Sequence, residues 1–205
     1  MNTATQSVKV WDPIVRIGHW SLVIAFFTAY LTEEEFMTQH VWAGYVVAGV
    51  VAFRIVWGII GSKHARFSDF IYKPSAVFGY LKNLIQRKPQ HYLGHNPAGG
   101  AMVIALLIGL SGIAYSGMAL LAVEKNDGPL VSWYGSPQLP ATVGEAKATH
   151  LVNEQDEEFW EELHETFVNF TLLLVALHIS GVIFSSYVDK ENLIKAMFTG
   201  RKDNS

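Results

Sequence analysis

The sequence predicts an all-α integral membrane protein: a four-helix transmembrane bundle with a surface helix on its cytoplasmic side and an extended loop outside. Half of its 205 residues are hydrophobic and only 16% are charged, whereas a soluble domain carries about a quarter charged residues. The apolar residues gather in four runs, each close to the roughly 20 residues that cross a bilayer. We expect one domain over residues 1–205, without internal repeats.

The expected spans cover residues 14–31, 40–60, 99–123 and 167–187. Residues 75–85 are too few to span and include Lys82, so we expect an amphipathic helix on the membrane surface. The acidic residues 154–165 are expected to extend the fourth helix beyond the membrane. The polar first twelve residues lead directly into an apolar run, which does not resemble a cleavable signal sequence.

The distribution of Lys and Arg predicts the orientation, because cytoplasmic loops are enriched in both. Residues 61–98 carry six of them against the single acid Asp69, and the C-terminal tail adds four more. The first loop instead has three consecutive glutamates, and residues 124–163 hold nine acids against two lysines. We therefore expect both termini in the cytoplasm and an acidic outer face, in a multi-pass protein of a bacterial inner membrane.

The absence of cysteine excludes disulfides, iron–sulfur clusters, thiolate zinc sites and covalently attached haem. Titratable side chains within membrane spans are costly and indicate function. His178 follows His164 by fourteen residues, close to four helical turns, so both project from nearly one face about 21 Å apart. His19 is expected at the inner level of the membrane and His40 at the outer level.

The alternating helix directions pair His19 with His178 and His40 with His164. Two imidazoles from different helices can hold a porphyrin iron between them, so the pattern predicts two non-covalent b haems, one near each membrane face. With both axial positions filled, such haems suit electron transfer and not oxygen activation. For His40 and His164, each at a helix end, an interfacial role is the alternative.

Two arginines and three loop histidines are further candidates. Arg16, one turn before His19, and Arg54 are placed to meet haem propionates; an ordinary cytoplasmic anchor is the alternative for Arg16. His64, His91 and His95 lie in the cytoplasmic loop, where a surface or structural role is the simpler interpretation. His95, just before the third span, is the best candidate for a quinone pocket.

Several motifs resemble the bacterial cytochrome b561 and nickel–iron hydrogenase cytochrome b family. They are Val10-Trp11-Asp12-Pro13 with His19-Trp20, His40-Val41-x-x-Gly44, Arg54-x-x-Trp57-Gly58, Gly94-His95-Asn96-Pro97-x-Gly99, and His164-Glu165-Thr166-x-x-Asn169 with Leu177-His178. The resemblance covers almost the whole chain and all four proposed ligands. It implies a di-haem carrier of electrons between the quinone pool and a redox protein outside the membrane. The long acidic outer loop departs from the simple family pattern.

The expected function is therefore an electron-transfer component of an oxidoreductase system. Its partner would be a c-type cytochrome or a dehydrogenase, and a basic protein could dock on residues 154–165; a merely solvated helix end is the alternative for that segment. One competing function is a superoxide:quinone oxidoreductase acting at the outer haem, although the acidic outer face disfavours collection of an anion. The other is a non-redox haem-binding sensor.

Overall fold

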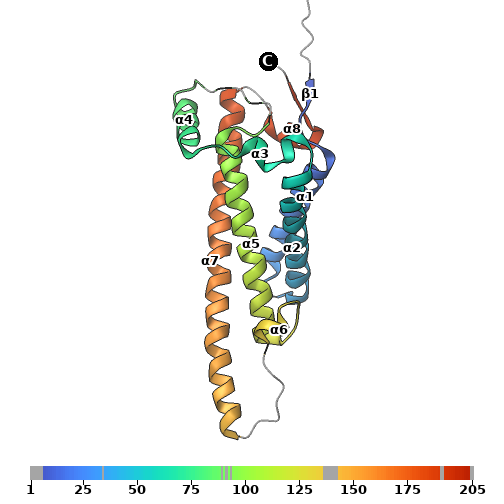
Figure 1. Cartoon of the computed structure of the whole chain (residues 1–205), viewed down its shortest axis with the longest axis vertical. Helices are drawn as coiled ribbons and strands as arrows, with labels where there is room; N and C mark the ends of the chain where they lie inside the picture. The colour runs from blue at the N-terminus through green and yellow to red at the C-terminus, as the bar shows by residue number, and fades with distance from the viewer. Residues whose placement is uncertain are drawn as a thin grey trace, which may run out of the picture. The chain divides into compact units, whose positions relative to one another are not determined.

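The computed structural model describes residues 7–33, 35–88, 90, 92, 94–135, 143–189 and 192–203 (Figure 1), with the backbone alone for residues 7, 8, 143–153 and 203. The chain forms two compact units. Unit 1 comprises Met1–Leu107 and Leu173–Ser205, and unit 2 comprises Ile108–Leu172. The expectation of a single domain over residues 1–205 stays a prediction.

Within the described residues, four helices are long and apolar enough to cross a membrane. They are α1 (Pro13–Thr32), α2 (Met37–Ile60), α5 (Pro97–Lys125) and α7 (Val143–Asp189), of which Glu154–Asp189 is the span candidate. Large apolar side chains on them point outward: Ile24 is 68% exposed and Trp42 67%. Such exposure suits a lipid surround, and the four predicted spans are confirmed.

Local sequence explains where the helices begin. Asp12 caps α1, its carboxylate accepting a hydrogen bond from the Val15 amide at 2.8 Å, and Pro13 follows at the first helical position. At α5 the Asn96 side chain accepts from the Gly99 amide at 2.7 Å, again followed by a proline, Pro97. The Asn-Pro-x-Gly motif is thus a helix cap.

Short elements gather at one end of unit 1 (Figure 1). They are the 3-10 turn η1 (Lys63–Ala65), α3 (Phe67–Phe70), α4 (Pro74–Ile85), α8 (Leu193–Thr199) and the strands β1 (Ser7–Lys9) and β2 (Arg201–Asp203). Helix α4 is the predicted surface helix, with Phe78 72% and Ile85 74% exposed. We call this end the basic end, because it holds most of the Lys and Arg of residues 61–98 and of the C-terminal tail.

The two strands were not expected from the sequence. β1 pairs antiparallel with β2, with Ser7 opposite Asp203 and Lys9 opposite Arg201. Gly200, in a left-handed conformation with φ 77°, ends α8 and turns the chain into β2. The pairing places residues 7–9 beside residues 201–203, so both segments lie at the basic end.

Residues 124–163, expected as a long outer loop, are more helical than predicted. Helix α5 continues to Lys125 and α7 already begins at Val143, so the connection is residues 126–142, containing the short helix α6 (Val131–Tyr134); residues 136–142 lie outside the described part. Good helix formers, chiefly Ala, Glu, Gln and Leu, fill residues 145–165 and account for the early start of α7.

In unit 2, α5 presents small residues to α7. A Cβ added at Gly109 would lie 2.5 Å from the Thr171 hydroxyl, and one at Gly112 would lie 2.4 Å from the Phe167 ring. Ser116 and Thr171 are fully buried. Small residues let transmembrane helices approach closely, and Gly109 and Gly112 leave this room between α5 and α7.

Candidate functional site

His19 and His178 face one another in unit 1. His19 lies in α1 and His178 in the second half of α7, with ring centroids 6.5 Å apart and ring planes at 56°. Two imidazoles bound to opposite sides of one metal ion, with metal–nitrogen bonds of about 2 Å, have centroids about 6.3 Å apart. The observed spacing therefore fits a single iron between the rings.

Buried nitrogens without partners occur at His19 and near it on α1. The Nδ1 atom of His19, the Nε1 atom of Trp20 and the Nε atom of Arg16 are buried, and none of them has a hydrogen-bond partner in the part of the chain that the structure describes. Arg16 does donate through its terminal nitrogen to the Phe198 carbonyl, and Trp20 stacks on the Phe198 ring at 4.4 Å. Buried donors are nearly always paired, so this cluster suits an acceptor-bearing group that the protein chain does not supply.

Arg54 of α2 also lies near the basic end. Its guanidinium lies over the rings of Phe67 and Phe70, at 5.4 and 5.8 Å from their centroids. One terminal nitrogen is buried and makes no hydrogen bond to any described residue. A guanidinium in poorly solvated surroundings favours a carboxylate or phosphate partner.

His40, one turn into α2, is oriented by α1. Its Nδ1 atom lies 2.9 Å from the Ala29 carbonyl oxygen. A carbonyl can only accept, so Nδ1 carries the proton and Nε2 carries the lone pair. Metal-binding histidines commonly donate their second ring nitrogen to a backbone carbonyl in this way.

His164 of α7 has an equivalent contact in unit 2. Its Nδ1 atom lies 3.1 Å from the Ser116 hydroxyl, and that hydroxyl donates to the Gly112 carbonyl at 2.7 Å. The serine oxygen therefore accepts from Nδ1, and Nε2 of His164 carries the lone pair. His40 belongs to unit 1 and His164 to unit 2, and each has the tautomer that a metal ligand requires.

His95 lies two residues before α5, in the segment that follows α4, and packs against aromatic rings. The Trp11 ring meets it edge-on at 4.5 Å, and the Phe70 ring lies at 4.5 Å. Its Nδ1 atom is buried without a partner among the described residues. Burial, with the nearby positive charges of Arg54 and Lys202, lowers the pKa of His95 to about 3. The imidazole is therefore neutral at physiological pH.

The donor set fits a haem better than a metal ion held by side chains alone. The described residues contain no group of three or more His, Asp or Glu that could hold an ion, and a haem iron needs only two protein ligands. There is also room beside two of the histidines. A Cβ added at Gly44, one turn beyond His40, or at Gly181, three residues beyond His178, would meet no atom within 4 Å.

The sequence offered no sign of some contacts around these candidates. Ser116 orients His164 from another helix, and nothing in its local sequence marks it. Asp12 joins the start of α1 to the end of α2, accepting from the Trp57 indole at 3.3 Å and from the Ser62 hydroxyl. His91 lies outside the described residues, whereas His64 bonds to Asp69 at 2.9 Å.

Comparisons with known proteins assign the family. The family model for prokaryotic cytochrome b561 matches residues 10–200. A probable Ni/Fe-hydrogenase B-type cytochrome subunit of Bradyrhizobium diazoefficiens is 24% identical over 96% of this chain and 86% of its own length. The proteins of the same description from Azotobacter chroococcum and Azotobacter vinelandii are 24% and 22% identical, over 95% of this chain and 88% of theirs.

No solved structure matches the chain. The family match covers all four spans and every candidate residue described above. The electron-transfer character and the b haem that the sequence predicts are those of this family. The chain belongs to the prokaryotic cytochrome b561 family and is a multi-pass membrane b-type cytochrome that transfers electrons.

Proposed function

We propose that this chain is a di-haem cytochrome that carries electrons between the quinone pool and a redox protein outside the membrane. The observation that carries the proposal is the His19–His178 pair, with ring centroids 6.5 Å apart. A haem bound there supplies a reversible one-electron centre. Both of its axial positions would be occupied by protein, which favours outer-sphere electron transfer over oxygen binding.

The second haem of the proposal is held by His40 and His164. Support comes from the two hydrogen bonds that leave the lone pair of each ring on Nε2, to the Ala29 carbonyl and the Ser116 hydroxyl. Further support comes from Gly117, whose missing side chain lets His164 lie against α5. The two histidines would then serve one haem at the level opposite the His19–His178 pair.

Arg16 and Arg54 are proposed to bind the propionates of the inner haem. Each has a buried guanidinium nitrogen without a described partner. A carboxylate is the acceptor that such a donor pairs with most strongly. The remaining contacts of both side chains, to the Phe198 carbonyl and to the Phe67 and Phe70 rings, would hold the guanidinium groups in place.

The proposed orientation places the basic end, and with it both termini, in the cytoplasm of a bacterial cell, with the protein in the inner membrane. The pairing of β1 with β2 supports a common side for the termini. The excess of Lys and Arg at that end supports the cytoplasm as that side. The acidic part of α7, residues 154–165, would then face outward.

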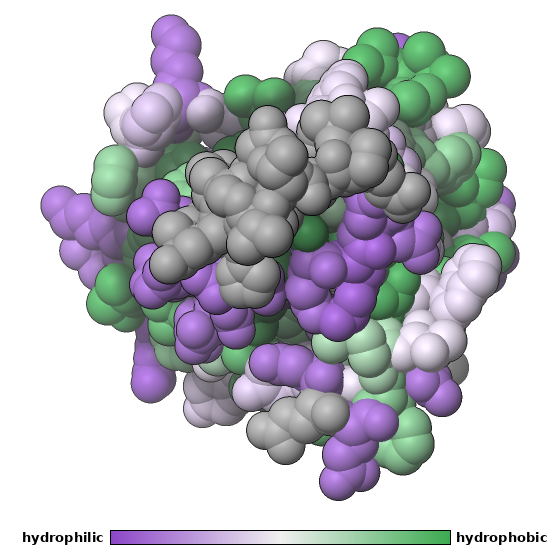
Figure 2. All heavy atoms as spheres, turned by 90° about the horizontal axis from the view of Figure 1, so that it is seen from below, coloured by the Kyte–Doolittle hydropathy of each residue, from purple (hydrophilic) through white to green (hydrophobic). Residues whose placement is uncertain are grey.

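The proposal assigns quinone to the basic end and the redox partner to the outer face. His95 offers a neutral imidazole with a buried, unpartnered nitrogen between Trp11 and Phe70, which suits hydrogen bonding to a flat carbonyl ligand. The relatives are described as hydrogenase subunits, which supports a dehydrogenase, beside a c-type cytochrome, as the class of partner. In the end-on view of Figure 2, hydrophilic side chains lie in several groups among hydrophobic ones.

The competing activities have less support. A superoxide:quinone oxidoreductase would need positive charge to collect its anion, and residues 154–165 carry acids without a base. A non-redox sensor gains little from two haems whose axial positions are both filled.

The test is a pyridine haemochrome assay with a redox-titrated visible spectrum of the purified protein. We expect two b haems per chain, both low-spin in both oxidation states. His19→Ala or His178→Ala should remove one haem, and His40→Ala or His164→Ala the other. A ratio of one haem per chain, or loss of both haems from every single variant in folded protein, contradicts the proposal.

A further inference from the structure

We propose that His64 and Asp69 form a proton-transfer pair that serves the quinone beside His95. This inference rests on the proposed quinone site. It assigns a role to two side chains that the proposed function does not use to bind haem or quinone. Reduction of a quinone takes two electrons and two protons, and an O–H bond forms at each quinone oxygen. The electrons come from the electron transfer that the family performs. The protons need a path from water.

The geometry of the pair suits this task. The Nδ1 atom of His64 lies 2.9 Å from Oδ2 of Asp69, and their side chains are 24% and 25% exposed. A carboxylate can only accept, so Nδ1 carries the proton and the lone pair is on Nε2, which takes up a proton from water. The carboxylate then stabilises the imidazolium. The two groups are thus half-buried, in reach of both solvent and the protein interior.

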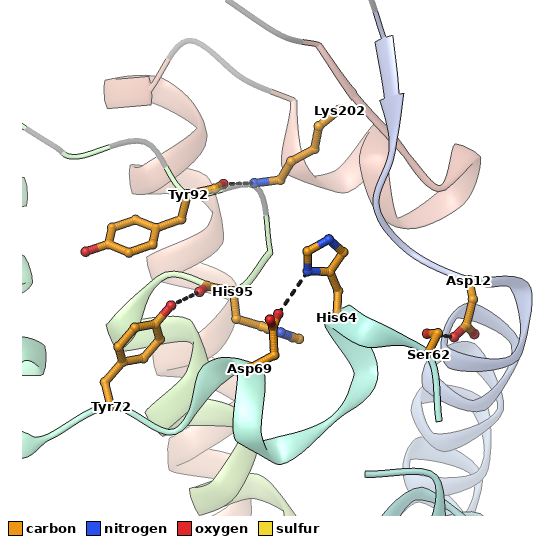
Figure 3. Close-up of polar contacts among 8 residues, drawn as sticks. All are labelled: Asp12, Ser62, His64, Asp69, Tyr72, Tyr92, His95 and Lys202. Carbon is orange, nitrogen blue, oxygen red and sulfur yellow. Dashed lines mark hydrogen bonds and ion pairs between the residues drawn. The ribbon is translucent and has the colours of Figure 1, made fainter. Parts of the chain in front are cut away.

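The pair lies directly against the backbone that carries His95. A Cβ added at Gly94 would be 3.0 Å from Nδ1 of His64 and 3.3 Å from Oδ2 of Asp69, so both side chains lie close against the backbone at Gly94. Tyr72, two residues beyond α3, donates from its hydroxyl to the His95 carbonyl at 3.2 Å. Figure 3 shows these side chains converging from η1, α3 and the segment before α5.

His95 itself is poorly suited to supply protons. Burial, together with the positive charges of Arg54 on α2 and Lys202 on β2, keeps its pKa low, near 3; His64 acts in the same direction and only Asp69 opposes. Lys202 is held at this place by a hydrogen bond from Nζ to the Tyr92 carbonyl at 3.1 Å. A neutral His95 can bind a quinone oxygen, but a second group has to bring each proton from solvent.

The proposed step balances without any further reactant. The His64 imidazolium gives up one proton, which bonds to a reduced quinone oxygen, and the neutral ring regains a proton from water. Asp69 accepts the hydrogen bond from Nδ1 throughout and holds the ring in place. The pair works twice for each quinone reduced to quinol.

The test compares Asp69→Asn, His64→Gln and His95→Leu with wild type, with Asp69→Glu as the conservative variant. Ser68→Ala is the matched control, since Ser68 is an exposed neighbour of Asp69 on α3. The purified holoprotein is reduced, freed of reductant and mixed anaerobically with a short-tailed ubiquinone analogue. Haem oxidation is followed by stopped flow from pH 6 to 9, and proton uptake by an indicator dye. Analogue affinity is measured separately by calorimetry.

Asp69→Asn and His64→Gln should slow haem oxidation and dye-detected proton uptake together, by about tenfold or more. Analogue affinity and the haem spectra should stay unchanged, Asp69→Glu should recover most of the rate, and Ser68→Ala should match wild type. Unchanged rates and pH profiles in both variants, while His95→Leu abolishes analogue binding, would overturn the proton pair and leave the quinone site standing. Unchanged binding in His95→Leu, together with unchanged rates in all variants, would overturn both.

Discussion

A single methyl group at Gly117 should weaken binding of the haem proposed between His40 and His164. A Cβ added there would lie 2.9 Å from Cε1 and 3.2 Å from Nδ1 of His164, where ordinary contact begins at 3.4 Å. The ring therefore has to move by about 0.5 Å away from α5. Its 3.1 Å hydrogen bond to Ser116 would then stretch to about 3.6 Å, beyond the useful range.

The size of the effect follows from that lost hydrogen bond. Removing the group that orients a metal-binding histidine costs about 10- to 100-fold in affinity, or about 1.4 to 2.7 kcal/mol. We expect Gly117→Ala to bind the haem at the His40–His164 level that much more weakly. The haem proposed at the His19–His178 level should be unaffected, because the three atoms nearest to the added Cβ all belong to His164.

The assay is titration of haem into protein purified from haem-limited cells, followed by visible and low-temperature EPR spectra of each haem. Gly49→Ala is the matched control, since a Cβ there meets no atom within 4 Å and Gly49 also lies in a membrane span. Equal haem affinity in the two variants would refute the reasoning. Equal weakening of both haems in Gly117→Ala would show that the effect is not local to His164.

Three further variants test other contacts. Asp12→Ala should lower the free energy of unfolding by about 1 kcal/mol at pH 7. Burial raises the pKa of Asp12, but hydrogen bonds from Ser62, Val15 and Trp57 outweigh burial and lower the pKa. In thermal melts, the difference between Asp12→Ala and wild type should therefore vanish as the pH falls below the usual pKa of 3.8. In Gly100→Ala, the new Cβ would lie 2.2 Å from the Phe70 carbonyl oxygen, so the free energy of unfolding should fall by about 1–3 kcal/mol. Gly79→Ala is the control, because a Cβ there meets no atom within 4 Å, and its thermal melt should match that of wild type. The last variant neutralises part of the acidic segment 154–165 by substitution to Gln at Glu157, Glu158, Glu161 and Glu162. It should slow electron transfer with a basic partner at low salt without changing the haem spectra. A rate that depends neither on salt nor on the substitutions would exclude docking on this segment.

The four spans and the surface helix could be predicted from the sequence alone, because a bilayer imposes length and hydropathy on each segment independently of its neighbours. The absence of cysteine and the level of each histidine along its helix are likewise local properties. Together they were enough to predict haem and the pairing of His19 with His178 before any contact was known. The family match agrees with the electron-transfer function that this pattern predicts.

Contacts between distant segments depended on the tertiary structure. The pairing of β1 with β2 joins residues almost 200 positions apart, and no local pattern predicts such a partner. The tautomers of His40 and His164 depend on Ala29 and Ser116, which lie on other helices. His64 and Asp69 looked like separate loop residues until the fold brought both against Gly94. The sequence determines which groups a side chain can donate or accept with. The tertiary structure determines its hydrogen-bond partner, because that partner is whichever group the fold brings within about 3 Å.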